Sequence, residues 1–446
     1  MENKQYIVSV EIGSSKIVGT LGEKDKQGAI SVIAIACEKL TTDCVRRGLV
    51  QNVEEAKAHV SRILEQLEAQ IAPTKIAGVY VGIAGRSLHN VPIEVSQNLD
   101  TNQPVSERTV NALSQRAAES SVEGEVLAVT PVIYVLDGKQ ETRNPIGSYS
   151  SSITARLNLI VAKTALKTNL HRVFDSITKV KGFIITPLAV GDKTLNSDER
   201  QLGCMLVDFG AETTTVSIYK NEALQYLATL PMGSRHITLD IASMSIVEAK
   251  AEDLKHSVGN AMELDIKDNQ VIDGVRVNDV SSFVMARVGE IGANISQQLN
   301  YAGMSTDDIT AGGVVLVGAG SRLNGFESFI AKTLKVKVSK GQHCGFVNLL
   351  DHNAENFEFI QSVALFATAA ETIAAGDSCG LTPEAERVDP PETEEEAVPE
   401  TPKKPKKPGV LKRFFGKIGD AASDVFNSSE EGDNYSEEEE EKSEKY

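Results

Sequence analysis

The segment that decides the fold is Val8-Ser-Val-Glu-Ile-Gly-Ser-Ser-Lys-Ile-Val-Gly19, together with its second copy, Met205-Leu-Val-Asp-Phe-Gly-Ala-Glu-Thr-Thr-Thr-Val-Ser217. Each segment is an apolar strand that ends in an acid, then a glycine turn with small hydroxyl side chains, then a second strand. A repeated unit indicates a duplicated architecture. We therefore expect two related halves of α/β type.

The composition of these turns is typical of a clamp for a nucleotide with its magnesium ion. Glycine allows backbone N–H groups to approach phosphates closely, and a carboxylate can hold Mg²⁺ directly or through water. A third element, Val314-Val-Leu-Val-Gly-Ala-Gly-Ser-Arg322, is a buried strand followed by small residues against which an adenosine could lie. Each element alone is weak evidence, because a strand that feeds a flexible glycine turn is common. The three together, in this order, predict a nucleotide between the two halves.

The overall composition excludes several other classes. The 446 residues carry a net charge of −17, and the body of the chain has no basic patch that would suit a nucleic acid. The five cysteines form no Cys-x-x-Cys pair, which argues against zinc and fits a reducing compartment. The N-terminus has no apolar signal region, and no run of 18 apolar residues suggests a membrane span.

The sequence resembles the actin-like ATPase superfamily, which includes sugar kinases and 70-kDa heat-shock chaperones, and within it the FtsA family of bacterial cell-division proteins. The residues that carry the resemblance run from Pro187 to Thr214 and include the acid and glycine of the second hairpin; Pro231-Met-Gly233 and Ala251-Glu-Asp-Leu-Lys255 match further along. The resemblance covers about residues 5–375 and recurs at the tail. It implies duplicated actin-like (ribonuclease-H-like) α/β domains with a nucleotide cleft, an inserted small α+β subdomain, and a disordered C-terminal tail with an amphipathic helix.

The domain organisation follows from the resemblance and from shifts in composition along the chain. We expect subdomain 1A in two parts, 1–85 and 163–200; the inserted FtsA-type subdomain 1C at 86–162; subdomain 2A in two parts, 201–235 and 309–376; subdomain 2B at 236–308; a disordered linker at 377–409; a membrane-targeting helix at 410–426; and an acidic disordered tail at 427–446.

The resemblance also implies roles for individual residues around ATP and Mg²⁺. Glu11 and Asp208 would hold the metal, and Asp208 is the one candidate for a catalytic group. Glu252 and Lys255 would reach the ribose and adenine, although as an i,i+3 pair they also fit a solvated ion pair of small energy. The phosphate and adenosine contacts would be Gly13, Ser14, Ser15, Lys16, Gly210, Thr213, Thr214, Gly233, Gly318, Ala319, Gly320 and Arg322.

Two departures from the superfamily pattern affect the chemistry. The first acid is Glu11 where the superfamily usually has aspartate, so the magnesium geometry would differ. Thr186, before Pro187, stands where the chaperones have a catalytic carboxylate. A threonine cannot serve as a general base near neutral pH. We therefore expect a weak ATPase at most.

The tail carries a second functional signal. Apolar residues recur every three or four positions after a long charged linker, and basic residues flank them. This pattern is typical of a helix that lies on an anionic membrane surface, with docking on a protein partner as the alternative; the acidic residues that follow would weaken membrane attachment. The membrane-contacting candidates are Leu411, Lys412, Arg413, Phe414, Phe415, Lys417, Ile418, Val425 and Phe426.

The function that the resemblance implies is an ATP-binding protein that polymerises at the division site, on the cytoplasmic face of the inner membrane. It would tether the ring of the tubulin-like protein FtsZ, whose C-terminal peptide would dock on residues 236–308, with Arg287 as a candidate contact. Two alternatives remain at this point: a small-molecule kinase of the same fold, for which we see no substrate-binding acid, and a pilus-assembly scaffold, which would not be expected to carry the basic amphipathic tail.

Overall fold

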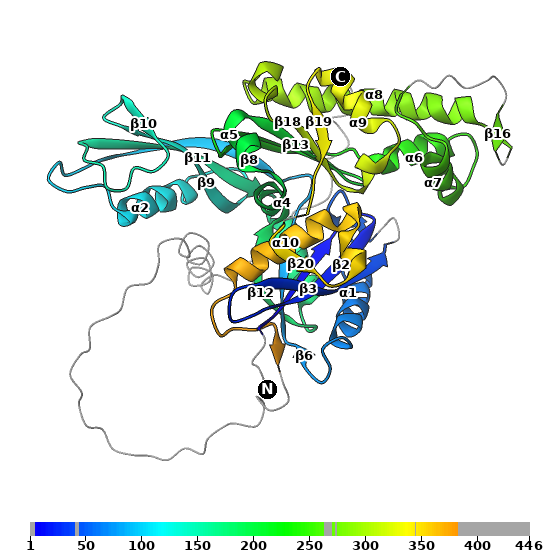
Figure 1. Ribbon diagram of the computed structural model, residues 1–446, viewed down its shortest axis with the longest axis horizontal. Helices are drawn as coiled ribbons and strands as arrows, with labels where there is room; N and C mark the ends of the chain where they lie inside the picture. Colours follow the sequence, from blue (N-terminus) through cyan, green and yellow to red (C-terminus); the bar gives the residue numbers. More distant parts are fainter. Residues whose placement is uncertain (1–4, 41–43, 263–269, 273, 344, 382–446) are drawn as a thin grey trace, which may run out of the picture. The chain divides into compact units, whose positions relative to one another are not determined.

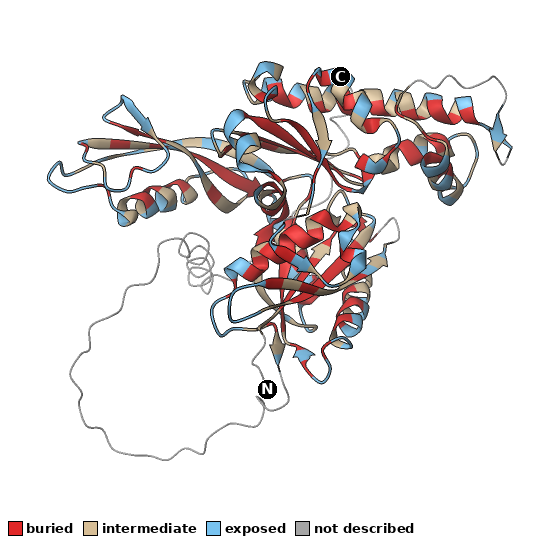
Figure 2. Ribbon diagram, in the orientation of Figure 1, coloured by how far each residue is buried: buried red, intermediate tan, exposed pale blue. Residues whose placement is uncertain are grey.

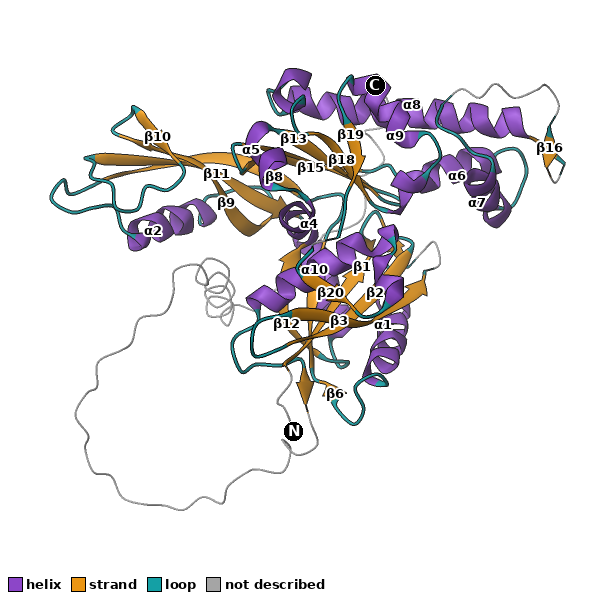
Figure 3. Cartoon of the chain, viewed as in Figure 1, coloured by secondary structure: helices purple, strands orange, loops and turns teal. Residues whose placement is uncertain are grey.

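The computed structural model describes residues 5–40, 44–262, 270–272, 274–343 and 345–381. All of them fall within Met1–Glu392, one of the two units into which the chain divides. This unit is built on two β-sheets with helices packed against both (Figures 1 and 3). Within the described ranges, no helix combines the length and hydropathy that a bilayer crossing needs.

The first sheet has six strands in the order β12-β7-β1-β2-β3-β20. Helices cover both of its faces, and glycines in β2 give them room. A Cβ on Gly19 would collide with Ile63 of one helix, α1, and a Cβ on Gly22 would collide with Phe366 of another, α10. The bounds are β1 Gln5–Ile12, β2 Lys16–Lys24, β3 Ile30–Lys39, β7 Gly78–Ile83, β12 Lys179–Ile185, β20 Val347–Leu349, α1 Val53–Glu68 and α10 Ile360–Thr372.

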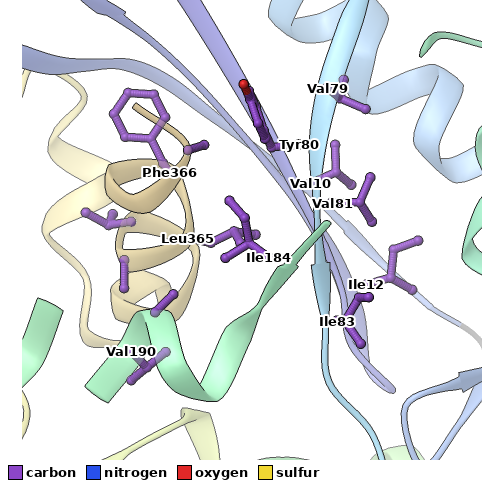
Figure 4. Packing of buried hydrophobic residues seen from close by; sticks show 14 of the residues in the cluster. Val10, Ile12, Val79, Tyr80, Val81, Ile83, Ile184, Val190, Leu365 and Phe366 are labelled. Atoms are coloured by element: carbon purple, nitrogen blue, oxygen red, sulfur yellow. The ribbon is translucent and has the colours of Figure 1, made fainter. Parts of the chain in front are cut away.

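The core of this half follows from the alternation of side chains along its strands. Figure 4 shows Leu365 of α10 directed at Ile184 of β12, whereas Val79, Val81 and Ile83 of β7 lie on the other side of the sheet. All five side chains are at least nine-tenths buried. The sheet is thus sandwiched between apolar layers, and Figure 2 shows α10 itself buried along much of its length.

The second sheet has nine strands in the order β10-β9-β11-β8-β15-β14-β13-β18-β19. A single residue pair, Ala228 with His89, joins β15 to β8, so the sheet consists of two well-paired parts with a narrow junction. The part formed by β8 to β11 has its own core with one helix, α2. The bounds are β8 His89–Asn98, β9 Glu125–Leu136, β10 Gln140–Thr142, β11 Ser152–Ala162, β13 Cys204–Phe209, β14 Thr214–Lys220, β15 Ala223–Leu230, β18 Gly313–Val317, β19 Val338–Lys340 and α2 Glu107–Ala118.

Shorter elements complete the unit. Helices α6 to α9 gather at the β13–β18–β19 end of the second sheet, where they share a core with β13 and β14 (Figure 3). The remaining bounds are α3 Thr164–Phe174, α4 Thr186–Thr194, α5 Ser197–Leu202, α6 Ser234–Ala242, α7 Glu248–Ser257, α8 Val277–Tyr301, α9 Phe326–Leu334, β4 Val45–Arg46, β5 Leu49–Val50, β6 Lys75–Ile76, β16 Val271–Ile272, β17 Val275–Arg276, β21 Gly380–Leu381, and the 3₁₀ helices η1 Thr306–Ile309, η2 Ala319–Arg322, η3 His352–Glu355 and η4 Phe357–Phe359.

The sequence repeat is also a repeat of backbone geometry. In the first hairpin Glu11 lies opposite Val18, and in the second Asp208 lies opposite Thr215, so each acid has the same register to its turn. Each first strand also has a parallel neighbour on its other side, β7 for β1 and β18 for β13. The two acids therefore occupy equivalent places in two equivalent sheets.

The structure corrects one part of the expected organisation. We expected all of residues 309–376 to continue the second half, and β18 and β19 do so. However, β20 pairs with β3, and α10 packs on β1, β2 and α4 of the first half. The reason is the apolar face of α10, whose buried side chains fill the space above the first sheet.

Candidate functional site

The two acids are held by neighbouring residues at the start of α10. Ser362 Oγ donates a hydrogen bond to Glu11 Oε2 at 2.5 Å. Gln361 Nε2 donates one to Asp208 Oδ2 at 2.6 Å. The other oxygen of Asp208, Oδ1, is buried and has no hydrogen-bond partner among the described residues. One helix turn thus connects the acid of the first hairpin with the acid of the second.

The environment of these acids opposes their negative charge. Burial raises the pKa of Asp208 to about 7, and the nearby charge of Glu11 adds to the effect, while the hydrogen bond from Gln361 acts in the other direction. Burial also raises the pKa of Glu11, against the hydrogen bond from Ser362 and the charge of Lys16. Both acids receive their hydrogen bonds from neutral donors, and Lys16, whose charge acts on Glu11, is bonded to Glu358 instead.

These features fit a divalent cation. A buried carboxylate oxygen without a partner is the kind of group that a cation or its bound water satisfies. The described residues include no cluster of three or more His, Cys, Asp or Glu that could hold a metal. Glu11 and Asp208 would therefore supply at most two protein ligands, and a Mg²⁺ ion there would take the others from phosphate oxygens and water, as is usual for this metal.

The raised pKa of Asp208 predicts a pH dependence of stability without cation. Because the folded-state pKa of about 7 lies above the ordinary 3.8, this group's contribution to stability declines as the pH rises from about 4 to about 7 and stays lost above that. The difference corresponds to at most about 4 kcal/mol. In EDTA, the melting temperature should fall more between pH 5 and pH 8 for the parent than for Asp208→Asn, which cannot ionise. Equal decreases would contradict the burial of an ionisable Asp208.

The glycines after β18 are required by close packing against Asp208 and Phe209, apart from any contact with a ligand. Gly318 has a φ of 82°, and a Cβ there would lie 2.5 Å from Asp208 Oδ1. A Cβ on Gly320 would lie 2.7 Å from the Phe209 carbonyl oxygen. A bulky residue at Gly318 would therefore strain the backbone and displace Asp208, so it would not probe an adenosine contact alone. Ala319, between the glycines, is exposed.

The two hairpin turns have the same internal hydrogen bond. Gly13 N–H donates to the Lys16 carbonyl at 3.0 Å, and Gly210 N–H donates to that of Thr213 at 2.9 Å. Ser15 is exposed in the first turn. Ser14 Oγ accepts a hydrogen bond from Gly48 N–H at 3.0 Å, so the first turn is tied to the loop between β4 and β5.

The second turn is built tightly against the start of α6. Gly233 has no room for a side chain, because its Cβ would lie 2.4 Å from the Ala211 carbonyl oxygen. Thr214 is fully buried, and its hydroxyl donates to the Met232 carbonyl at 2.8 Å. Its expected contact with phosphate is therefore not available in this arrangement, whereas Thr213 is only partly buried and has no such bond among the described contacts.

Lys16 and Arg322 both contact the carboxylate of Glu358, a residue that the sequence analysis did not single out. Lys16 Nζ lies 2.9 Å from Glu358 Oε2 and 4.6 Å from the centre of the Phe359 ring. Arg322 Nη1 lies 3.9 Å from Glu358 Oε1. Burial acts to raise the pKa of Glu358, but these cations outweigh it and hold the pKa below its ordinary value. Phosphates bound at the first turn would compete with Glu358 for Lys16.

Glu252 and Lys255 form an ion pair in which the lysine is buried and the Glu252 side chain is 42% exposed. Lys255 Nζ lies 2.7 Å from Glu252 Oε2 and 3.0 Å from Thr238 Oγ1 of α6. The Lys255 side chain is 3% exposed, and burial lowers the pKa of Lys255. The i,i+3 ion pair that we weighed as an alternative is present; its glutamate is solvated, whereas its lysine is buried and ties α7 to α6 through Thr238.

Arg287 on α8 is engaged within the chain. Its guanidinium contacts both carboxylate oxygens of Asp240 on α6, at 2.6 and 2.9 Å, and also pairs with Glu290. A partner that binds Arg287 would have to compete with these acids. The membrane candidates between Leu411 and Phe426 lie outside the described residues.

Sequence reasoning missed a polar connection between the halves. Glu212, in the second turn, is buried; its Oε2 accepts the Arg47 backbone N–H at 2.6 Å, and its Oε1 accepts Arg235 Nη1 at the same distance. Gly48, next to Arg47, binds the first turn through Ser14. The loop between β4 and β5 thus contacts both hairpin turns. An acid within a glycine turn was the only sequence signal for this connection.

Comparisons with known proteins support a single family. The family profile described as "Cell division protein FtsA" matches residues 205–364. The cell division protein FtsA of Porphyromonas gingivalis is 31% identical over 346 residues, which cover 74% of this chain and 71% of the relative. That of Escherichia coli strain K12 is 24% identical over 406 residues, which cover 86% and 93%. A chain of a PilM-PilN type IV pilus biogenesis complex matches the structure with a TM-score of 0.58 and 14% identity, over 82% of this chain and 98% of that chain, which shows a shared fold.

Proposed function

Because this chain belongs to the FtsA family of cell division proteins, with its actin-like fold, we propose that it binds ATP·Mg²⁺ and acts as a membrane-attached component of the division site. In this proposal it polymerises on the cytoplasmic face of the inner membrane. Its C-terminal helix binds anionic lipid, and its surface around residues 236–308 receives the C-terminal peptide of FtsZ.

The observation that carries the nucleotide part is the pair of acids in matching registers. Glu11 and Asp208 end equivalent strands, share the first turn of α10, and leave one buried oxygen without a partner. A bound Mg²⁺ would supply the missing positive charge and neutralise phosphate oxygens. The turns at Gly13 and Gly210 have the glycines that close approach of a phosphate requires.

We also propose that ATP turnover is slow. Thr186 is 2% exposed at the start of α4, and its hydroxyl has no hydrogen-bond partner among the described residues. A hydroxyl in this position cannot accept the proton of an attacking water near neutral pH, and losing a general base typically costs about 10²–10⁴-fold in rate. Asp208 would be occupied by the metal. The bound nucleotide would then act mainly as a structural ligand.

A location test addresses the cellular part of the proposal. A fluorescent fusion of the full chain, expressed in dividing cells of its own host, should form a ring at mid-cell before constriction. The free fluorescent protein serves as the control for diffuse signal. A fusion that stays evenly distributed through division, at normal expression and with intact length on a gel, would contradict a role at the division site.

A further inference from the structure

We propose that Gln361 and Ser362, consecutive residues at the start of α10, are positioning residues that orient the acids of the two halves toward one divalent cation. This inference rests on the proposed nucleotide and magnesium site, and it assigns to α10 a role that the hairpin motifs do not contain. Neither side chain needs to touch the cation; each acts through the carboxylate that it holds.

Each carboxylate accepts a hydrogen bond from α10 on one of its two oxygens. Ser362 donates to Oε2 of Glu11, and Gln361 donates to Oδ2 of Asp208. Oδ1 of Asp208 is buried without a hydrogen-bond partner among the described residues, and the bond from Ser362 to Oε2 leaves Oε1 as the second oxygen of Glu11. Each acid therefore keeps one oxygen for a cation or its water while the other fixes the rotamer, which is how outer partners orient metal ligands in general.

The donors are neutral, and this matters for binding. A lysine or arginine in their place would neutralise the acids and compete with a cation. Lys16, whose charge acts against the burial that raises the pKa of Glu11, is bonded to Glu358 at 2.9 Å. Amide and hydroxyl donors hold the carboxylates without cancelling the charge that attracts the metal.

Helix α10 is anchored firmly enough to impose this geometry. Ser362 is 2% exposed, and the next turn buries Leu365 and Phe366 completely. Phe366 packs where Gly22 lacks a side chain, and Leu365 packs on Gly82. Successive side chains of a helix point about 100° apart. Gln361 and Ser362 can therefore donate hydrogen bonds in different directions, one to the acid of each half. A shift of α10 would move both acids together.

A simpler account is that these bonds only satisfy two partly buried acids where the halves meet. That account predicts that removing a donor lowers stability and leaves cation affinity unchanged. The positioning account predicts weaker cation binding even where the fold is retained. The two accounts are therefore separated by measuring affinity and stability on the same variants.

The experiment uses Mn²⁺ as the probe, with the full chain in saturating ADP, and measures free Mn²⁺ by electron paramagnetic resonance. Ser362→Ala and Gln361→Met remove one donor each, and Gln361→Asn keeps the amide but shortens its reach. Each should weaken Mn²⁺ binding about 10- to 100-fold, the usual effect of losing an outer partner of a metal ligand. Thr368→Ala is the matched control, because the Thr368 hydroxyl bonds only to the Ala364 carbonyl within α10.

Melting curves of the same samples establish that each variant is folded, and Gln361→Asn is the mildest change if the other two unfold. Folded variants with the Mn²⁺ affinity of the parent would overturn the inference. A Thr368→Ala variant that loses as much affinity as the others would also overturn it, because the effect would then come from α10 as a whole. If the parent binds neither ADP nor Mn²⁺, the proposed nucleotide site fails, and the inference fails with it.

Discussion

Asp208→Ala should lower the affinity for ATP·Mg²⁺ by at least about 100-fold, because the loss of a metal ligand exceeds the 10- to 100-fold that an outer partner contributes. The substitution removes the acid whose Oδ1 is buried without a partner and leaves Gln361 without its acceptor. It also removes one of the two carboxylates that we propose as ligands, so that Glu11 would be the remaining protein ligand of the cation.

Calorimetry with ATP in the presence and absence of Mg²⁺ separates the metal effect from a general loss of the site. In EDTA, Asp208→Ala should bind ATP at least as well as the parent, since a carboxylate near phosphates is repulsive without a cation between them. Asp307→Ala, at an exposed acid on η1, is the control for a change in net charge. An Asp208→Ala protein that keeps the parent's affinity in Mg²⁺ would show that the metal binds elsewhere or not at all.

The sequence predicted the features of the candidate site that lie within a single hairpin. The strand, acid and glycine of each hairpin lie within a few residues of one another, so their order alone predicts that Glu11 and Asp208 end equivalent strands. The structure bears this out in the matching registers. The close approach at Gly318 follows from the same pattern, because its φ of 82° and its nearness to Asp208 require a glycine.

The missed contacts are long-range contacts. Ser362 reaches Glu11 across 351 positions and Gln361 reaches Asp208 across 153. No pattern within α10 distinguishes these donors from ordinary polar residues at a helix start. The return of α10 to the first sheet was missed for a related reason: an apolar helix face does not say which sheet will cover it. A buried threonine such as Thr214 likewise gave no signal that its hydroxyl would bind a carbonyl.

Lys16 illustrates how a residue expected at the phosphates can have another partner in the absence of nucleotide. We expected it at the phosphates, and the structure pairs it with Glu358, which also attracts Arg322. Phosphates are stronger attractors than a partly exposed carboxylate, because they carry more charge. Binding would then release Glu358 from Lys16. Since Glu358 lies two residues before α10 begins, the first turn and the start of α10 are coupled through this ion pair.

The second prediction concerns the tail, where we expect a change in membrane affinity of similar size. Residues 382–446 lie outside the described structure. As a helix, 410–426 would be about 25 Å long, but Lys412, Arg413 and Lys417 prevent it from spanning a membrane, so it would lie flat on the surface. Full burial of a phenylalanine is worth about 1.5–3 kcal/mol, and partial burial of two gives about 2–3 kcal/mol in total. That corresponds to roughly 30- to 150-fold in membrane affinity.

Replacing Phe414 and Phe415 together by glutamate should therefore abolish sedimentation with anionic vesicles. The change removes two apolar anchors and adds two charges that an anionic surface repels.

The matched control is Ser428→Glu with Ser429→Glu, which adds the same charge just beyond the helix and leaves both anchors in place. This control should lose far less binding, and both variants should retain ATP binding, because the proposed nucleotide site involves other parts of the chain. If the Phe414/Phe415 variant pellets like the parent, the membrane contact lies elsewhere and this helix docks on protein. If the serine control is released equally, charge alone governs attachment and the two aromatic residues are not its anchors.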